Sequence, residues 1–169
     1  TGHHETTAGC LALLDRLKST GRRYRQIADI GTGTGLLAFA ALALWPRARA
    51  IASDIDPLAI EVAEQNAVIN SITLGTGPGR LELVIAAGLV HRRLRARAPY
   101  DLLIANILAN PLIELAGDFG GRVKPGGRLV LTGILSEQAQ AVQAAYQPAF
   151  DFDPPVHDAE WVLLAATKR

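Results

Sequence analysis

Short apolar runs alternate along the chain with longer segments that have helical spacing. The apolar runs cover residues 26–30, 50–53, 81–86, 101–105 and 128–135. Their residues are continuously apolar rather than alternating with polar ones, which is typical of strands in a parallel sheet that is covered on both faces. The sequence therefore predicts five strands in a parallel sheet.

The segments between these runs predict helices at 6–18, 35–44, 111–119 and from Ser136 through Tyr146. A further helix should start at Asp56-Pro57, with Asp as the N-cap and Pro at the first helical position. Asn110 before Pro111 is predicted as another helix cap, and residues 150–167 predict an antiparallel strand pair around Pro154-Pro155. Strands that alternate with helices indicate an α/β, Rossmann-like fold.

Composition narrows the class of protein but not its activity. The chain has 169 residues, of which 49% are hydrophobic and 20% charged, so we expect one globular domain over 1–169. A net charge of +1 gives no whole-molecule attraction to nucleic acid or membrane. No apolar run reaches the roughly 18–20 residues of a membrane span, and the single cysteine, Cys10, suits a reducing cytoplasm. We therefore expect a cytoplasmic protein without membrane contact.

Three alternate glycines, Gly31, Gly33 and Gly35, follow the first strand and precede a helix. The dinucleotide fingerprint requires a third glycine where this chain has Leu36, and no Gly-Lys-Ser/Thr follows as in a P-loop. Such a loop still predicts backbone N–H groups and a helix N-terminus facing an anion. A carboxylate beside a cation, as in S-adenosylmethionine, fits better than a pyrophosphate; a plain tight turn is the alternative.

Asp54 ends the second strand, where an acidic side chain accepts hydrogen bonds from ribose hydroxyls of a cofactor lying across the sheet edge. The next strand is followed by VIAAGLVHRR, which has no Asp to hold an adenine amino group. We therefore expect backbone groups and apolar contacts to hold adenine. No His, Cys, Asp or Glu cluster has metal-ligand spacing, so no metal site is predicted.

Six segments resemble, in order, the ribosomal-protein methyltransferases of the PrmA type, which modify the large-subunit stalk-base protein numbered eleven. They are TGHHETTAGCL, ADIGTGTGLLAFAA, SDIDPLAIEVAEQNAVIN, YDLLIANILANPLIELA, VKPGGRLVLTGIL and EWVLLAATKR. The middle four occur in looser form in many class I methyltransferases, whereas TGHHETT and ANILANPL are far more specific.

This resemblance implies a Rossmann-like class I methyltransferase with a seven-stranded sheet and S-adenosylmethionine as methyl donor. It also implies methylation of lysine ε-amino, and sometimes α-amino, groups of a large-subunit ribosomal protein. Carried over by motif, the cofactor contacts are Thr7, Gly31, Asp54 and Asn106, and the expected cofactor-binding set also includes Gly33, Gly35 and Ile55. The Asn106 side-chain oxygen and the Ile107 backbone carbonyl are the expected acceptors for the substrate amine.

Several alternatives stay open. Family members usually carry an N-terminal domain that grips the ribosomal protein, and residues 1–169 hold no counterpart. Either that segment precedes Thr1, or the chain methylates another protein lysine or a small amine. A cofactor-binding module without turnover is a third alternative. His3, His4 and Glu5 either cover the methyl group or form a frayed polar end. The basic runs 21–25 and 91–98 are either solvated faces or an incidental contact to ribosomal RNA.

Overall fold

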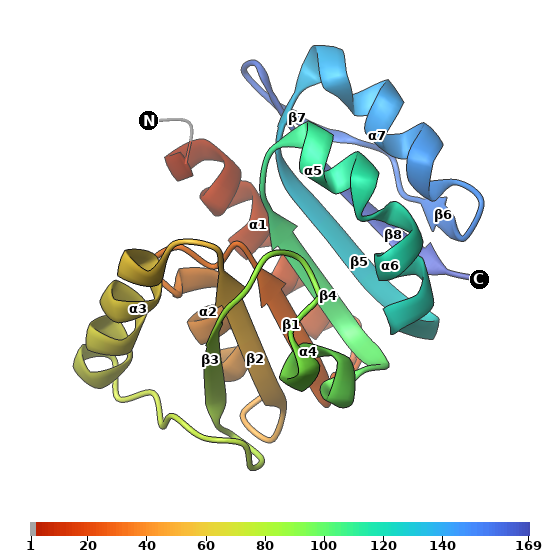
Figure 1. Ribbon diagram of the computed structural model, residues 1–169. Helices are drawn as coiled ribbons and strands as arrows, with labels where there is room; N and C mark the ends of the chain where they lie inside the picture. The colour runs from red at the N-terminus through yellow and green to blue at the C-terminus, as the bar shows by residue number, and fades with distance from the viewer. Residues whose placement is uncertain (1–2) are drawn as a thin grey trace.

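Helices and strands alternate along most of the chain (Figure 1). The computed structural model describes the backbone of residues 3–169 and the side chains of residues 6–169. The elements in chain order are α1 (His3–Ser19), β1 (Gln26–Ile30), α2 (Leu36–Leu44), β2 (Arg49–Asp54), α3 (Pro57–Ile69), β3 (Leu81–Ile85), α4 (Arg92–Arg97), β4 (Tyr100–Asn106), α5 (Ala109–Glu114), α6 (Ala116–Arg122), β5 (Val123–Leu135), a 3₁₀ turn (Ser136–Gln138), α7 (Ala139–Tyr146), β6 (Phe150–Phe152), β7 (Val156–Asp158) and β8 (Trp161–Lys168).

The strands form one sheet in the order β3-β2-β1-β4-β5-β8-β6, with β7 also paired to β8. The five strands from β3 to β5 are parallel, and β8 runs antiparallel to β5. The predicted α/β architecture is confirmed, including the antiparallel strands at the C-terminal end of the chain.

The sheet has eight strands rather than seven because its last position is divided between two short strands. β6 pairs with β8 around Ala166–Lys168, and β7 pairs with it around Trp161–Leu163. Pro154 and Pro155 lie between them, where proline lacks the N–H that a continuous ladder requires.

Alternate residues of the central strands point into two separate cores. Leu103 and Ala105 of β4 belong to the core under α4, α5, α6 and α7, whereas Leu102 and Ile104 belong to the core under α1, α2 and α3. All four side chains are fully buried. The continuous apolar runs of the sequence thus reflect a sheet with helices on both faces, as Figure 1 shows.

Two local predictions require correction, and one is confirmed. The Asp56 side chain accepts the Leu58 N–H at 2.9 Å and caps α3 as predicted. Asn110 is not a cap, because α5 begins at Ala109 after the N-cap residue Leu108. The helix predicted at 111–119 is two helices, α5 and α6, which divide at Leu115.

In the described part of the chain no helix is both long and apolar enough to cross a membrane.

Candidate functional site

A cleft of about 830 Å³ opens at the carboxyl ends of the parallel strands. Its walls come from the glycine loop after β1, the end of β2, the loop after β3, the end of β4 and helix α5. Open α/β sheets bind ligands at this edge. Seven of the eight predicted site residues line the cleft: Thr7, Gly31, Gly33, Asp54, Ile55, Asn106 and Ile107.

The first N–H groups of the glycine loop donate hydrogen bonds to the end of β2. The N–H groups of Gly31 and Thr32 donate to the Ser53 carbonyl oxygen at 2.8 and 2.9 Å, and the Gly33 N–H donates to Asp54 Oδ2 at 2.9 Å. The sequence predicts these donors facing an anion. They face β2 instead, because the last carbonyl and carboxylate of β2 lie directly beside the loop.

Asp54 is fixed at the floor of the cleft by two backbone donors. Its Oδ2 accepts the Gly33 N–H, and its Oδ1 accepts the Asp56 N–H at 3.1 Å. The side chain is half-buried. Each carboxylate oxygen has a second lone pair, so the group can still accept two hydrogen bonds from a bound diol.

Gly31 lies where β1 and β4 leave no room for a side chain. Its φ is +75°, and a Cβ there would lie 2.3 Å from Ile107 Cγ2 and 2.9 Å from the Asn106 carbonyl oxygen. The pairing of Ile30 with Ala105 in the last register of the two strands explains this proximity. Glycine therefore brings the loop against the backbone that carries Asn106.

Asn106 is supported from its other side by an irregularity in β5. The pairing of β5 with β8 shifts register between Leu131 and Ile134, and Gly133 in this segment has a φ of +80°. A Cβ at Gly133 would lie 2.9 Å from Asn106 Oδ1 and 3.1 Å from the Ile107 carbonyl oxygen. Gly133 therefore lies against both predicted amine acceptors, while Gly31 packs against the backbone that carries them from the side of β1.

Gly35 does not line the cleft; it occupies the N-cap position of α2. Its φ is +89°, and a Cβ there would lie 2.6 Å from the Phe39 ring. Gly35 has no side chain to cap this helix; of the N–H groups in the first turn, that of Ala38 interacts with the Asp29 carboxylate. Leu36 and Leu37 of that turn line the cleft.

Asp29 is an ionisable residue beneath the loop that the sequence analysis missed. It is fully buried on β1 and accepts a hydrogen bond from the Thr32 hydroxyl at 2.7 Å. Burial, against the opposing effects of the Thr32 hydroxyl and the Ala38 N–H and with a smaller contribution from nearby Asp54, raises the pKa of Asp29 to about 6. An acidic residue in an otherwise apolar strand was the available signal for it.

The cleft is electrostatically negative. Asp54 and Glu114 line it, and no Lys or Arg among the residues of the described chain does so. Glu114 was also missed; it is the one ionisable residue in the apolar segment that follows Pro111.

Ala86, Ala87 and Gly88 form an apolar wall after β3, where the sequence predicts backbone and apolar contacts to adenine. The side chains of residues 3–5, considered above as a cover, lie outside the described residues.

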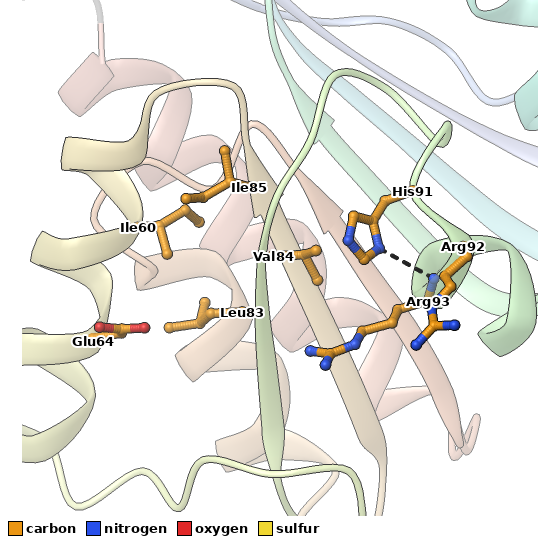
Figure 2. Close-up of a pocket in the computed structure, with 8 residues that line it drawn as sticks. All are labelled: Ile60, Glu64, Leu83, Val84, Ile85, His91, Arg92 and Arg93. Carbon is orange, nitrogen blue, oxygen red and sulfur yellow. Dashed lines mark hydrogen bonds between the residues drawn. The ribbon is translucent and has the colours of Figure 1, made fainter.

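A second, more open hollow of about 400 Å³ lies on the outer side of β3 (Figure 2). Ile60 and Glu64 of α3 border one side, and Arg92 and Arg93 of α4 border the other. The His91 ring accepts the Arg93 N–H at 3.2 Å and so caps α4. None of the predicted site residues lies in this hollow.

The model of the family "Ribosomal protein L11 methyltransferase (PrmA)" matches residues 1–169. A ribosomal protein L11 methyltransferase of Pseudomonas aeruginosa is 44% identical over all 169 residues, which are 53% of that relative. One from Brucella abortus is 41% identical over 168 residues, 99% of this chain and 56% of the relative. The chain thus spans about half the length of the curated relatives it matches.

A comparison with solved structures gives the same family as the sequence comparisons. The crystal structure of a ribosomal protein L11 methylase from Lactobacillus delbrueckii subsp. bulgaricus superposes with a TM-score of 0.85 at 27% identity. The match covers 100% of this chain and 81% of that one. Family model, sequence relatives and fold agree over essentially the whole chain, which belongs to the ribosomal protein L11 methyltransferase (PrmA) family.

Proposed function

We propose that residues 1–169 form the S-adenosylmethionine-dependent methyltransferase domain of an enzyme that methylates lysine ε-amino or α-amino groups of ribosomal protein L11 in the cytoplasm. The acceptor is supported by relatives, 41–44% identical, that are ribosomal protein L11 methyltransferases. The observation that carries the methyl-transfer proposal is the cleft, where a fixed carboxylate on β2 lies across the sheet edge from confined amine acceptors after β4.

The residues present fit this cofactor. Asp54 can accept both ribose hydroxyls, and the apolar wall Ala86–Gly88 suits a flat base. The first turn of α2, with no side-chain cap, can face the carboxylate of the methionine end. Asp54 and Glu114, with no opposing Lys or Arg among the described residues of the cleft, favour a ligand and a substrate that are both positively charged.

The protein contributes mainly placement to this reaction. When bound, S-adenosylmethionine supplies an electrophilic methyl carbon, whose bond to sulfur breaks as the bond to the amine nitrogen forms. Asn106 Oδ1 and the Ile107 carbonyl oxygen accept the remaining N–H groups of a neutral amine and thereby aim its lone pair into the cleft. Placement of this kind is worth up to several kcal/mol of activation free energy. Glu114 attracts the amine in its ammonium form.

The test compares two neighbouring acids of which only one lines the cleft. We expect Asp54→Ala to weaken the binding of S-adenosylhomocysteine by about 10-fold or more, because a hydrogen bond to a charged group contributes about 1.5–3 kcal/mol. Asp56→Ala should remove the N-cap of α3 but leave the affinity unchanged. Titration calorimetry measures both affinities.

The acceptor is tested separately with purified L11 and a radiolabelled methyl donor, with the modified residues located by mass spectrometry. The proposed cofactor is wrong if the folded parent does not bind S-adenosylhomocysteine, or if Asp54→Ala binds it like the parent. Methylation of other proteins in a cell extract but not of L11 would retain the methyltransferase and refute the L11 substrate.

A further inference from the structure

Three arginines lie side by side at the amino ends of adjacent strands, on the edge of the sheet opposite the cleft. Arg25 precedes β1, Arg49 begins β2 and Arg80 precedes β3. The Arg49 N–H donates to the Arg25 carbonyl oxygen at 2.8 Å, and the Ala50 N–H donates to the Arg80 carbonyl oxygen at 3.1 Å. All three side chains are exposed. In Figure 1 this edge is at the bottom of the sheet.

Three more exposed arginines extend this row. Arg22 and Arg23 lie in the turn before β1, and Arg47 lies in the turn before β2. Arg22 Nη1 donates to the Gly126 carbonyl oxygen at 3.3 Å, which carries the row toward the start of β5. We call these six residues the arginine strip: Arg22, Arg23, Arg25, Arg47, Arg49 and Arg80.

The positive charge of the arginine strip is not neutralised by acids of the described chain. Among the described residues, no Asp or Glu oxygen lies within 4.0 Å of a guanidinium nitrogen of these six arginines. Two acids near this end of the sheet are paired with other cations. Asp101 pairs with Lys124, and Glu82 pairs with Arg93 and Arg97.

The charge is also separated along the molecule. The net charge is only +1, yet residues 50–79 contain four acids and no Lys or Arg. Those residues include Asp54 at the cleft, whereas the arginine strip occupies the opposite ends of the same strands. A nearly neutral protein therefore presents one edge that attracts polyanions and one that repels them.

We propose that the arginine strip binds the phosphate backbone of structured RNA. Guanidinium groups bind phosphate oxygens through a planar fork of donors, and the amino ends of adjacent strands, about 4.8 Å apart, gather several of them at one end of the sheet. The aromatic residues nearest the strip, Tyr24 and Trp45, are buried against each other and cannot stack on unpaired bases. They also cannot anchor an amphipathic surface in a membrane.

The choice of RNA over other polyanions rests on the proposed function, because an enzyme that acts on a ribosomal protein meets ribosomal RNA. The contact is to phosphates and therefore independent of sequence. It would hold the chain on an assembling particle while the cleft, at the far edge of the sheet, remains open to the substrate.

The test measures binding of the purified chain to a fluorescein-labelled RNA hairpin by anisotropy over a range of salt concentrations. The strip variant is Arg25→Gln/Arg49→Gln/Arg80→Gln, and the matched control, with the same charge change elsewhere, is Arg92→Gln/Lys168→Gln/Arg169→Gln. Each lost phosphate contact should reduce the slope of log affinity against log salt by about 0.9. The strip variant should therefore lose about 2–3 from this slope and about tenfold or more in affinity at low salt, while the control retains both.

Two further measurements make the result decisive. The strip variant must bind S-adenosylhomocysteine as the parent does, which shows an intact fold and is read independently of RNA. Should that variant fail to fold, Arg→Lys at the same three positions keeps the charge, and we expect the salt slope of the parent with weaker affinity. The proposal is overturned by an equal loss in the control, by tighter binding to unstructured polyuridine, or by preference for anionic phospholipid vesicles. Failure of L11 methylation alone would refute the proposed function and leave the RNA measurement standing.

Discussion

At the scale of single residues, Gly31 and Gly33 differ in a way that separates backbone strain from steric contact. Both have positive φ values, +75° and +55°, but a Cβ would meet Ile107 and Asn106 at Gly31 and nothing within 4 Å at Gly33. We expect Gly33→Ala to cost about 1–2 kcal/mol, from the left-handed backbone alone. Gly31→Ala should cost about 1–3 kcal/mol more, because it also overpacks the junction. Urea unfolding measures both, and equal losses would contradict the close approach.

Asp29 gives a prediction for the dependence of stability on pH. Burial raises its pKa to about 6 in the folded state, against 3.8 as the ordinary value. The folded state thus binds the proton more tightly, so the stabilisation is fully present below about pH 3.8 and is lost as pH rises through about 6. About two pKa units correspond to roughly 3 kcal/mol.

We therefore expect the free energy of unfolding of the parent, minus that of Asp29→Asn, to fall by roughly 3 kcal/mol between pH 4 and pH 7.5. Urea unfolding across this range measures it. Asp101 provides the opposite sign: burial raises its pKa, but Lys124 and the N–H groups of Gln26 and Arg25 outweigh this and lower it. The same difference for Asp101→Asn should rise with pH, and a parallel trend for both would contradict the assignment.

At the scale of elements, the irregular segment of β5 positions the predicted amine acceptors. Gly133→Ala would place a Cβ 2.9 Å from Asn106 Oδ1, so we expect it to move this oxygen and lower kcat for methyl transfer by about 10-fold or more, as misplacement of reacting groups does. Gly126→Ala is the matched control in the same strand, since its φ is +77° but nothing lies within 4 Å. Steady-state kinetics distinguishes them, and equal effects would refute positioning through β5.

The helices and strands also show which parts of the fold could be predicted from the sequence alone. Continuous apolar runs predicted β1 to β5 within a few residues, because strands buried on both faces carry this pattern in their own residues. Helix α4 was missed, since in RRLRAR only Leu94 is buried and the arginines conceal the helical period. The division at Leu115 between α5 and α6 was missed as well; both helices pack against α7, a contact that no local pattern encodes.

Some residues of the candidate site could likewise be predicted from the sequence, and others could not. Gly31 follows a strand, and Asp54 and Asn106 end strands, so parallel-sheet topology brought them together in one cleft once the strands were identified. Glu114 reached the same cleft from a helix, and only the packing of α5 over the sheet edge places it there. The use of the loop N–H groups was not predictable either, because it depends on where the last carbonyl of β2 stops.

At the scale of the whole molecule, the cleft is lined by segments from the helical layers on both faces of the sheet and by the strand ends between them. Thr7 of α1 comes from one side of the sheet and Leu115 at the start of α6 from the other, while Asp54 and Asn106 end two strands between them. A ligand held by all of these segments should stabilise the entire fold rather than one loop. The effect on the midpoint of thermal unfolding, Tm, is therefore a test of the site as a whole.

We expect S-adenosylhomocysteine at 100 times its Kd to add about 2.7 kcal/mol to the free energy of unfolding. For a chain of this length that corresponds to a rise in Tm of about 5–10 °C in a scanning calorimeter. Asp56→Ala should lower the starting Tm, because α3 loses its cap, yet keep the full rise. At the same ligand concentration, Asp54→Ala with a 10-fold weaker affinity should lose about half of the rise, and more if the affinity falls further. A rise of equal size in both variants would mean that the ligand binds outside the cleft, since the two carboxylates are two residues apart and only Asp54 lines it.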